Sequence, residues 1–355
     1  MSTFADLRAS CLFQELLTVS ERLGHDPMQV QGPGGNTSVK ANGAMWVKAS
    51  GTWLAEARER EIMVPVDAAG IRSALAKGDA TAEDGAAFTA NAENASGLRP
   101  SIETSVHAVL DWPVVLHTHC VATIATAVRA DAEAVIRDKL AGLDAVYVPY
   151  VKPGADLARA IRARVNGDTR VIVLGNHGLV ACGEQPAEAE ALVYEVARRL
   201  EPDIGPGTDA APGLADGIVG PGWMPVSYGP TDMIARSPEL LAIADGTTLY
   251  PDHLIFLGPG VAVAEAGEDA QAAATRVSSG GAARKLVLFP GQGAAIPADA
   301  SPSVVALARA LGDVVCRIDP SAALTRLSPD DEAALLNWDA EKHRQALEAA
   351  RSAAP

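Results

Sequence analysis

The segment Leu116-His117-Thr118-His119-Cys120 combines the pattern of a buried strand with two histidines in alternate positions. The apolar, β-branched run Val114-Val115-Leu116 predicts a strand that continues through His119. Side chains alternate between the two faces of a strand, so His117 and His119 are expected to point the same way and form a chelating pair. Such a pair also occurs as two buried histidines without a metal, so the pair alone does not define a site.

A third histidine lies at a predicted tight turn. Val171-Ile172-Val173-Leu174 predicts a strand, Gly175-Asn176-His177-Gly178 a turn, and Leu179-Val180-Ala181 a second strand. Three neutral imidazoles with one open position are typical of a catalytic zinc or similar divalent-metal site, whereas closed structural sites favour four ligands that usually include cysteines. The sequence therefore predicts a site for Zn²⁺, or another divalent ion such as Mn²⁺ or Co²⁺, formed by His117, His119 and His177.

Two upstream loops have the composition of anion-binding loops. Gly32-Pro33-Gly34-Gly35-Asn36-Thr37-Ser38 exposes backbone N–H groups that can approach an anion closely. It is neither a Walker loop, because no Gly-Lys-Ser/Thr follows, nor a dinucleotide fingerprint, because Thr37 stands where a third glycine is needed. Lys48-Ala49-Ser50-Gly51-Thr52 offers a hydroxyl beside a free backbone. Each loop can equally be an ordinary hairpin turn.

An acidic residue lies close to a predicted helix start. Ser101 is a natural N-cap, and apolar residues follow it at near-helical spacing, so Glu103 is expected in the first turn of the helix. The common use of a carboxylate there is to stabilise the positive end of the helix. The residues alone leave a catalytic role for Glu103 open.

Five motifs in this order resemble the class II aldolase/adducin family, and together they are far more specific than any one of them. They are Gly35-Asn36-Thr37-Ser38, Ser50-Gly51, Ser101-Ile102-Glu103, His117-Thr118-His119 and Asn176-His177-Gly178. The resemblance implies a three-layer α/β/α domain with a central, mostly antiparallel sheet.

The later part of the chain narrows the resemblance to one group within the family. Three segments look like the aldolase half of bifunctional rhamnulose-phosphate aldolase/alcohol dehydrogenase fusions: Tyr250-Pro251-Asp252-His253, Leu288-Phe289-Pro290-Gly291-Gln292-Gly293 and Asn337-Trp338-Asp339-Ala340-Glu341. In such a fusion the dehydrogenase half would lie beyond residue 355, and it is absent from this sequence.

The resemblance also implies an activity. It is the reversible retro-aldol cleavage of a ketose phosphate or related sugar through a metal-stabilised enediolate, with the metal as Lewis acid. Glu103 would exchange the proton on the enediolate carbon. The family positions that hold the substrate phosphate correspond to Gly35, Asn36, Ser50, Gly51 and Ser101.

Two positions depart from the family pattern. Ile102 stands where the family often has a second hydroxyl, so a phosphate is held less tightly or is not the group that is recognised. Fuculose-phosphate aldolases have a proton-donating tyrosine downstream of the H-x-H motif, but residues 128–142 contain no tyrosine. Tyr147 and Tyr150 are the nearest substitutes, and we select Tyr150 as the donor. Both tyrosines can equally be packing residues.

The same three histidines occur in family members with other activities. Pentulose-phosphate epimerases, a thioribulose-phosphate dehydratase and decarboxylases also pass through a metal-stabilised enolate. A decarboxylase acting on a 3-oxo acid or sugar acid is the first alternative, and it would release carbon dioxide instead of an aldehyde. Non-catalytic adducin-like scaffolds lack the metal histidines. A cupin would need a glutamate shortly after His119, and the nearest acids are Asp131 and Glu133.

The composition of the chain limits the partners and the cellular location that can be expected. A net charge of −15 disfavours nucleic acid and anionic membranes as partners. The partner that the resemblance implies is a small-molecule sugar or sugar phosphate. Residues 1–24 predict an amphipathic first helix rather than a signal peptide or a membrane span. The four cysteines lack Cys-x-x-Cys spacing, which is typical of reduced thiols in the cytoplasm. The resemblance implies a homotetramer with sites between subunits.

The length of the chain and its internal Gly/Pro-rich stretch predict two α/β parts. Residues 1–203 form the expected catalytic domain, residues 204–226 a Gly/Pro-rich linker, and residues 227–355 a small C-terminal α/β domain. Within the last part, residues 254–257 predict a strand, and residues 329–350 a terminal helix.

Overall fold

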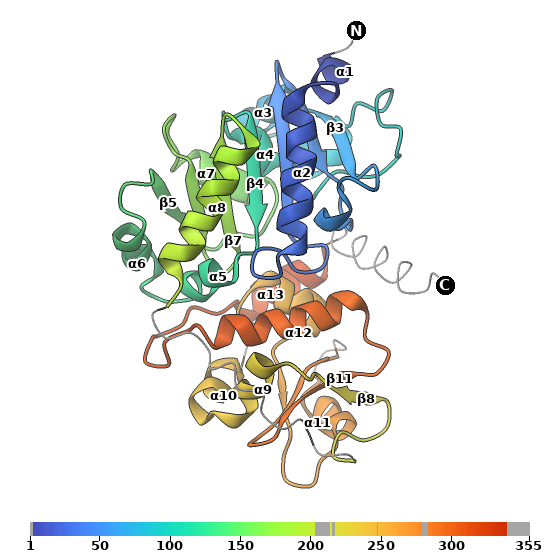
Figure 1. Ribbon diagram of the computed structural model, residues 1–355, viewed down its shortest axis with the longest axis vertical. Coiled ribbons are helices and arrows are strands. Elements are labelled where there is room, and N and C mark those ends of the chain that lie inside the picture. The colour runs from blue at the N-terminus through green and yellow to red at the C-terminus, as the bar shows by residue number, and fades with distance from the viewer. Residues whose placement is uncertain (1–2, 203–213, 215–216, 247, 279–282, 339–355) are drawn as a thin grey trace. The chain divides into compact units, whose positions relative to one another are not determined.

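The computed structural model describes residues 3–202, 214, 217–246, 248–278 and 283–338 (Figure 1). The chain forms two compact units. The first consists of Met1–Thr123 and Glu133–Leu200, and the second of Ile124–Ala132 and Glu201–Pro355. Most of the expected linker at residues 204–226, and the part of the expected terminal helix beyond residue 338, lie outside the described residues.

A seven-stranded sheet in the order β3-β2-β1-β4-β7-β6-β5 is the frame of the first unit. Every neighbouring pair is antiparallel except β5 and β6, which are parallel. The prediction of a mostly antiparallel central sheet is therefore confirmed. The strands are β1 Asn36–Ala41, β2 Ala44–Lys48, β3 Met63–Asp67, β4 Val114–Thr118, β5 Ala145–Val148, β6 Val171–Leu174 and β7 Gly178–Gly183.

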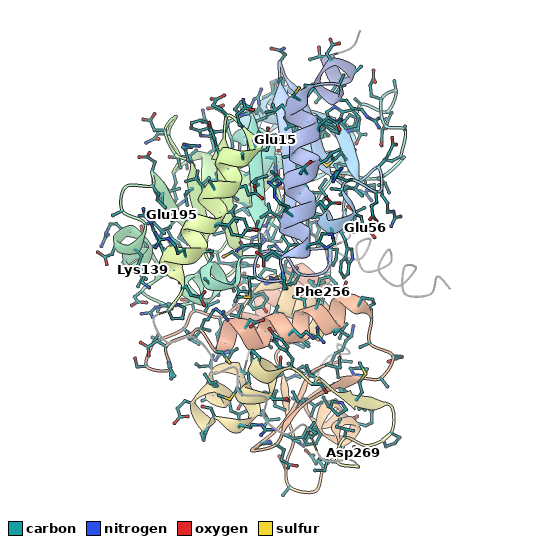
Figure 2. The ribbon with its side chains drawn as sticks, in the orientation of Figure 1. Glu15, Glu56, Lys139, Glu195, Phe256 and Asp269 are labelled. Atoms are coloured by element: carbon teal, nitrogen blue, oxygen red, sulfur yellow. The ribbon has the colours of Figure 1, made fainter. Side chains whose placement is uncertain are left out.

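Helices cover both faces of this sheet, which gives the expected three layers. On one face α2 and α8 lie side by side, and they carry the labelled side chains of Glu15 and Glu195 (Figure 2). On the other face α3, α4 and α7 contribute to one apolar core with the strands. The helices are α1 Thr3–Arg8, α2 Cys11–His25, α3 Ala68–Lys77, α4 Thr104–Val109, α5 Val121–Ala127, α6 Ala132–Lys139, α7 Ala155–Arg162 and α8 Pro186–Leu200, with short 3₁₀ turns at Leu54–Glu56, Ala80–Glu83 and Gly85–Phe88.

The N-terminal segment forms two helices rather than the single amphipathic helix expected over residues 1–24. Ser10 interrupts it, because its hydroxyl accepts a hydrogen bond from the Phe13 N–H at 3.2 Å and caps the start of α2. The buried stripe Leu16, Val19 and Leu23 then follows at helical spacing. Of the helices that the structure describes, none has the length and apolar character needed to cross a membrane.

The second unit is built on a smaller, four-stranded sheet in the order β8-β11-β10-β9. The predicted strand at residues 254–257 is wrong, because His253–Leu257 forms a π-helical turn. All five of its residues are buried, and a short run buried on every side has no periodicity that separates strand from helix. The strands are β8 Trp223–Pro225, β9 Ala262–Val263, β10 Val287–Phe289 and β11 Gly293–Pro297, and the helices are α9 Gly229–Arg236, α10 Pro238–Ala244, α11 Ala270–Val277, α12 Pro302–Val315 and α13 Pro329–Leu336.

Candidate metal centre

The three predicted histidines converge in the first unit. His117 lies near the end of β4, His119 directly follows that strand, and His177 lies in the turn between β6 and β7. One nitrogen from each ring lies within 4.8 Å of the other two, and all three residues are buried. The Nε2 atoms of His117 and His119 are 3.1 Å apart. Pairing of β7 with both β4 and β6 is what carries His177 to the other two histidines.

The turn that holds His177 depends on its neighbours. Asn176 adopts a left-handed conformation with φ of 54°, which asparagine tolerates better than most residues. A Cβ on Gly178 would lie 2.4 Å from the Thr118 carbonyl oxygen, so only glycine lets the turn approach the end of β4 so closely. The Asn176-His177-Gly178 motif is therefore a geometric requirement of this turn.

A backbone contact fixes the tautomer of His117. Its Nδ1 lies 3.0 Å from the Leu179 carbonyl oxygen, which can only accept a hydrogen bond. In the neutral ring Nδ1 therefore carries the proton, and Nε2 keeps its lone pair, which faces His119 Nε2 and Glu103 Oε2. Such a second hydrogen bond is the usual means of orienting a metal-binding imidazole.

Glu103 lies against the histidine nitrogens. Its Oε2 is 3.3 Å from His117 Nε2, its Oε1 is 3.5 Å from His177 Nε2, and Asn36 Nδ2 donates a hydrogen bond to Oε2 at 2.9 Å. Burial alone raises the pKa of Glu103, but positive charge on the three imidazoles and the hydrogen bond from the Asn36 amide lower the pKa by more, to about 2. Glu103 is therefore a buried carboxylate at the centre of the cluster.

The expected helix position of Glu103 is corrected by the structure. α4 begins at Thr104, and Glu103 is its N-cap residue rather than a member of the first turn. The reason lies in a local turn, in which the Ser101 hydroxyl accepts the Glu103 N–H at 3.2 Å and the Ser101 carbonyl accepts the Thr104 N–H at 3.1 Å. The Glu103 side chain makes no capping bond and is directed to the histidines instead.

His107 was not among the predicted site residues, but it bonds to one of them, Asn36. Its Nε2 donates to Asn36 Oδ1, and its Nδ1 accepts from the Ser38 hydroxyl at 2.7 Å. Burial lowers the pKa of His107 to about 3, so the ring is neutral and can fill both roles. The signal was present in the sequence, because His107 follows Glu103 by one helical turn.

The Gly-rich loop is brought to the site by β1 and by a buried lysine. Asn36 pairs with His117 across β1 and β4. Gly35 has φ of 62°, and a Cβ there would lie 2.8 Å from the His117 carbonyl oxygen. Lys48 Nζ donates to the carbonyls of Pro33 and Gly35 at 2.9 and 3.0 Å. This ammonium ties the loop to the end of β2.

The remaining predicted anion ligands lie on two adjoining segments. The Ser50 N–H donates to the Arg99 carbonyl at 2.9 Å, and the Ser101 N–H donates to the Lys48 carbonyl at the same distance. Gly51 has φ of 73° and turns the chain after Ser50. Ser50 and Ser101 are both buried. The structure thus brings Ser50, Gly51 and Ser101 together with the segment that carries Glu103.

Tyr150 lies next to the His177 turn through its backbone. A Cβ on Gly175 would lie 2.8 Å from the Tyr150 nitrogen and 2.6 Å from the Tyr147 hydroxyl oxygen. The Gly175 N–H donates to the Val148 carbonyl at 2.8 Å, which holds the end of β5 against this turn. The Tyr150 hydroxyl itself is buried.

The donor set fits a divalent metal ion. Three imidazole nitrogens converge, one tautomer is fixed by the backbone, and a charged carboxylate lies beside them. A mostly antiparallel sheet between helical layers, with this buried cluster at the end of its central strand, defines an α/β protein with a candidate metal centre.

The chain belongs to the family described as the class II aldolase and adducin N-terminal domain, whose model matches residues 14–202, more than half of the 355 residues. The uncharacterized oxidoreductase YuxG of Bacillus subtilis (strain 168) is 32% identical over 184 residues, which are 48% of this chain. The match spans only 26% of the length of YuxG.

Two solved structures are also similar to this chain. One is the N-terminal class II aldolase domain of a conserved protein from Thermoplasma acidophilum, with a TM-score of 0.48, 26% identity, and coverage of 54% of this chain and 92% of that one. The other is the L-fuculose-1-phosphate aldolase from Thermus thermophilus, with a TM-score of 0.34, 18% identity, and coverage of 52% and 92% respectively.

Proposed function

We propose that this protein is a divalent-metal-dependent aldolase that reversibly cleaves a ketose phosphate or a related sugar. The observation that carries the proposal is the Glu103 carboxylate at 3.3 and 3.5 Å from the Nε2 atoms of two converging histidines. Membership of the class II aldolase and adducin family supports the reaction class. The homotetramer that the resemblance implies and the cytoplasmic location expected from the cysteine spacing belong to this proposal.

His117, His119 and His177 would hold the ion, with zinc as the first choice. A divalent ion there supplies a Lewis acid that polarises a carbonyl oxygen and makes the neighbouring carbon more acidic. Glu103 then moves the proton at that carbon. As a carboxylate it accepts the proton, and as a carboxylic acid it returns the proton when the carbon–carbon bond has broken.

The Asn36–His107–Ser38 chain positions this base. The Asn36 amide donates to Glu103 Oε2 while its own oxygen accepts from His107, so the amide cannot rotate without losing both bonds. A fixed carboxylate keeps its second oxygen for the substrate. The backbone N–H groups around Gly35 and Gly51, with the hydroxyls of Ser50 and Ser101, would hold the substrate phosphate. In cleavage, Tyr150 would take up the proton of the substrate hydroxyl that becomes the aldehyde, and in the aldol direction it would return that proton to the same oxygen.

The first test is metal analysis of the purified protein, combined with deuterium exchange into dihydroxyacetone phosphate before and after treatment with a chelator. Stoichiometric divalent metal and metal-dependent exchange are expected. Metal without exchange would overturn the choice of dihydroxyacetone phosphate as donor. Protein that binds no divalent metal and catalyses no exchange would overturn the whole proposal in favour of an adducin-like scaffold.

A decarboxylase or epimerase uses the same proton chemistry, and the products separate these activities. The aldolase predicts an aldehyde from the cleaved sugar phosphate, whereas a decarboxylase releases carbon dioxide from a sugar acid. An epimerase returns a sugar of unchanged mass with inverted configuration at one carbon. Mass spectrometry and NMR of the products of a sugar-phosphate and sugar-acid panel distinguish all three.

A further inference from the structure

A second polar pocket lies at the opposite end of β1 from the metal centre. β1 begins with Asn36, which contacts Glu103, and Lys40 is near its other end. A pocket of about 550 Å³ opens there. Its lining includes Lys40, Arg72, the Asn42-Gly43 turn, Asp111 and Glu184, all of which belong to the first unit.

Lys40 is the unusual member of this lining. It is only 7% exposed, and its Nζ has no hydrogen-bond partner among the described residues. The other buried lysine of this hairpin, Lys48, is tied to two carbonyls. Removing an ammonium from water without a partner is costly, so an unpartnered one beside a pocket indicates a missing ligand. Burial lowers the pKa of Lys40 to about 8, which leaves most of it protonated at neutral pH.

Arg72 adds a second cation to the same pocket. It extends from α3, it is half-buried, and its Nη1 donates to the Ala108 carbonyl at 3.1 Å. A guanidinium carries five N–H donors, so several remain for a ligand. Arg72 and Asp111 also line an adjoining pocket of about 470 Å³ with Arg159 and Arg162.

The two carboxylates of the lining are placed differently from the cations. Asp111 is exposed, and its Oδ2 lies 3.5 Å from Arg162 Nη1. Glu184 is also exposed to solvent. The pocket therefore has buried or half-buried cations and solvent-exposed acids. Lys40 Nζ itself has almost no exposed surface. A small anion in the pocket would therefore contact the Arg72 guanidinium at the lining and reach the Lys40 ammonium through a change of the Lys40 rotamer.

We propose that this pocket binds a small oxyanion, the phosphate or carboxylate group of a metabolite, between Lys40 and Arg72. The Lys40 ammonium supplies a compact charge and the Arg72 guanidinium a planar pair of donors, the two modes in which proteins recognise such groups. The site is separate from the proposed substrate-phosphate loops at Gly35 and Ser50, and it does not depend on the aldolase proposal.

Calorimetric titration with inorganic phosphate tests this site in the full chain. The Ser50→Ala variant is the background, because it weakens the phosphate site proposed near the histidines. Lys40→Met in that background removes the charge and keeps the volume, and it should weaken phosphate binding about tenfold or more. Arg72→Gln should weaken binding in the same direction. Lys285→Met, at a partly buried lysine of the second unit, is the matched control and should leave the affinity unchanged.

A parallel titration with malonate distinguishes phosphorylated ligands from carboxylate ligands. If phosphate binds more tightly than malonate, the pocket is assigned to phosphorylated ligands, and the reverse order assigns it to carboxylates. Either assignment requires that Lys40→Met weaken the binding of both anions. The proposal would be overturned if the Lys40→Met and Arg72→Gln variants bound phosphate and malonate as tightly as the parent protein. It would also be overturned if no binding were detected in the Ser50→Ala background.

Discussion

At the scale of single residues, the charge on Glu103 depends on the groups around it. A carboxylate this deeply buried is ordinarily protonated, because burial disfavours its charged form. Here the Asn36 amide donates to one oxygen, and imidazole nitrogens lie 3.3 and 3.5 Å from the two oxygens. The balance favours the carboxylate. Glu103 is therefore unprotonated at neutral pH and has an oxygen free to take a proton, although the lowered pKa makes it a weaker base than an ordinary glutamate.

Replacing Glu103 by glutamine separates this role from metal binding. Glutamine has the same shape and can still accept the Asn36 hydrogen bond, but it cannot take a proton. We expect Glu103→Gln to keep its metal and to lose proton exchange into dihydroxyacetone phosphate by about 100-fold or more. Metal content by atomic emission and exchange by NMR are the two measurements.

His119→Ala is the matched variant, because it removes one of the three nitrogens and leaves Glu103 in place. It should lose most of its bound metal together with all exchange. If Glu103→Gln exchanged protons at the rate of the parent protein, Glu103 would not be the base. If His119→Ala kept stoichiometric metal, the assignment of the ligands would be wrong.

Gly35 offers a second prediction at this scale. A Cβ at Gly35 would lie 2.8 Å from the His117 carbonyl oxygen, and its φ of 62° is already unfavourable for alanine. We expect Gly35→Ala to lower the free energy of unfolding by about 2–4 kcal/mol and to displace the adjoining Asn36. Urea unfolding followed by tryptophan fluorescence measures the loss of stability.

Gly97 is the control for the cost of placing alanine in a left-handed backbone conformation. It has a similar φ of 65°, but a Cβ there would meet nothing within 4 Å. Gly97→Ala should therefore cost only about 1 kcal/mol. Equal losses in both variants would show that the contact with His117 does not matter.

At the scale of elements, the β1–β2 hairpin contains two buried lysines with different surroundings. Lys48 Nζ donates to the carbonyls of Pro33 and Gly35, whereas Lys40 Nζ has no partner among the described residues. We expect Lys48→Met to destabilise the protein by about 2–4 kcal/mol, because it leaves two carbonyls without their charged donor.

Lys40→Met is the control at the other end of this hairpin, and it should be neutral or stabilising by about 1 kcal/mol at neutral pH. Lys48→Met should also weaken binding of a phosphorylated substrate more than it slows turnover, since the loop it holds lies at the proposed phosphate site. Paired urea unfolding and steady-state kinetics test both expectations. A Lys48→Met protein as stable as Lys40→Met would show that the lysine does not hold the loop.

The same hairpin shows which elements are predictable from the sequence. Asn42-Gly43 is a typical hairpin turn, and β1 and β2 pair antiparallel around it. The two strands predicted on either side of the glycine turn at His177 also pair antiparallel, as expected. The shared face of His117 and His119 and the tight turn at His177 were predictable, because strand alternation and turn chemistry are local properties. Their convergence depends on the pairing of β7 with β4 and β6, and it was expected from the resemblance to the family. Local patterns therefore indicated the three histidines that are the candidate metal ligands.

What could not be predicted arises from contacts between segments that are distant in sequence. Two examples are the hydrogen bonds from Lys48 to the Gly-rich loop and the bond between Asn36 and His107. Each joins separate elements, and no periodic pattern in the sequence indicates it. Residues 253–257 form a π-helical turn although their composition is typical of a strand, because every side chain in the run is buried. Glu103 precedes its helix because the Ser101 hydroxyl stabilises a turn instead of capping the first helical turn.

At the scale of the whole molecule, the net charge of −15 opposes the approach of an anionic substrate. Any phosphate or carboxylate must therefore be held by cations and N–H groups placed locally. We propose two such places in the first unit, the loops beside the candidate metal centre and the pocket lined by Lys40 and Arg72. Because long-range attraction is absent, binding at either place should depend on salt only through the few charges in direct contact.

The buried charge of Lys40 also gives the stability of the molecule a pH dependence. Burial lowers the pKa of Lys40 to about 8 in the folded protein from its ordinary 10.5. Between these values the unfolded chain binds more protons than the folded one, so the free energy of unfolding rises with pH. Below about pH 8 both states are protonated, and this contribution stays constant at its least favourable value.

Other groups titrate in the same range, so the measurement is the difference between the parent protein and Lys40→Met. From about pH 7 to about pH 9.5, in a buffer free of phosphate, the parent should gain about 2 kcal/mol relative to the variant. Urea unfolding at both pH values gives the difference directly. Parallel pH profiles for the two proteins would mean that Lys40 keeps its ordinary pKa, so that water or an ion already reaches its ammonium in the folded state.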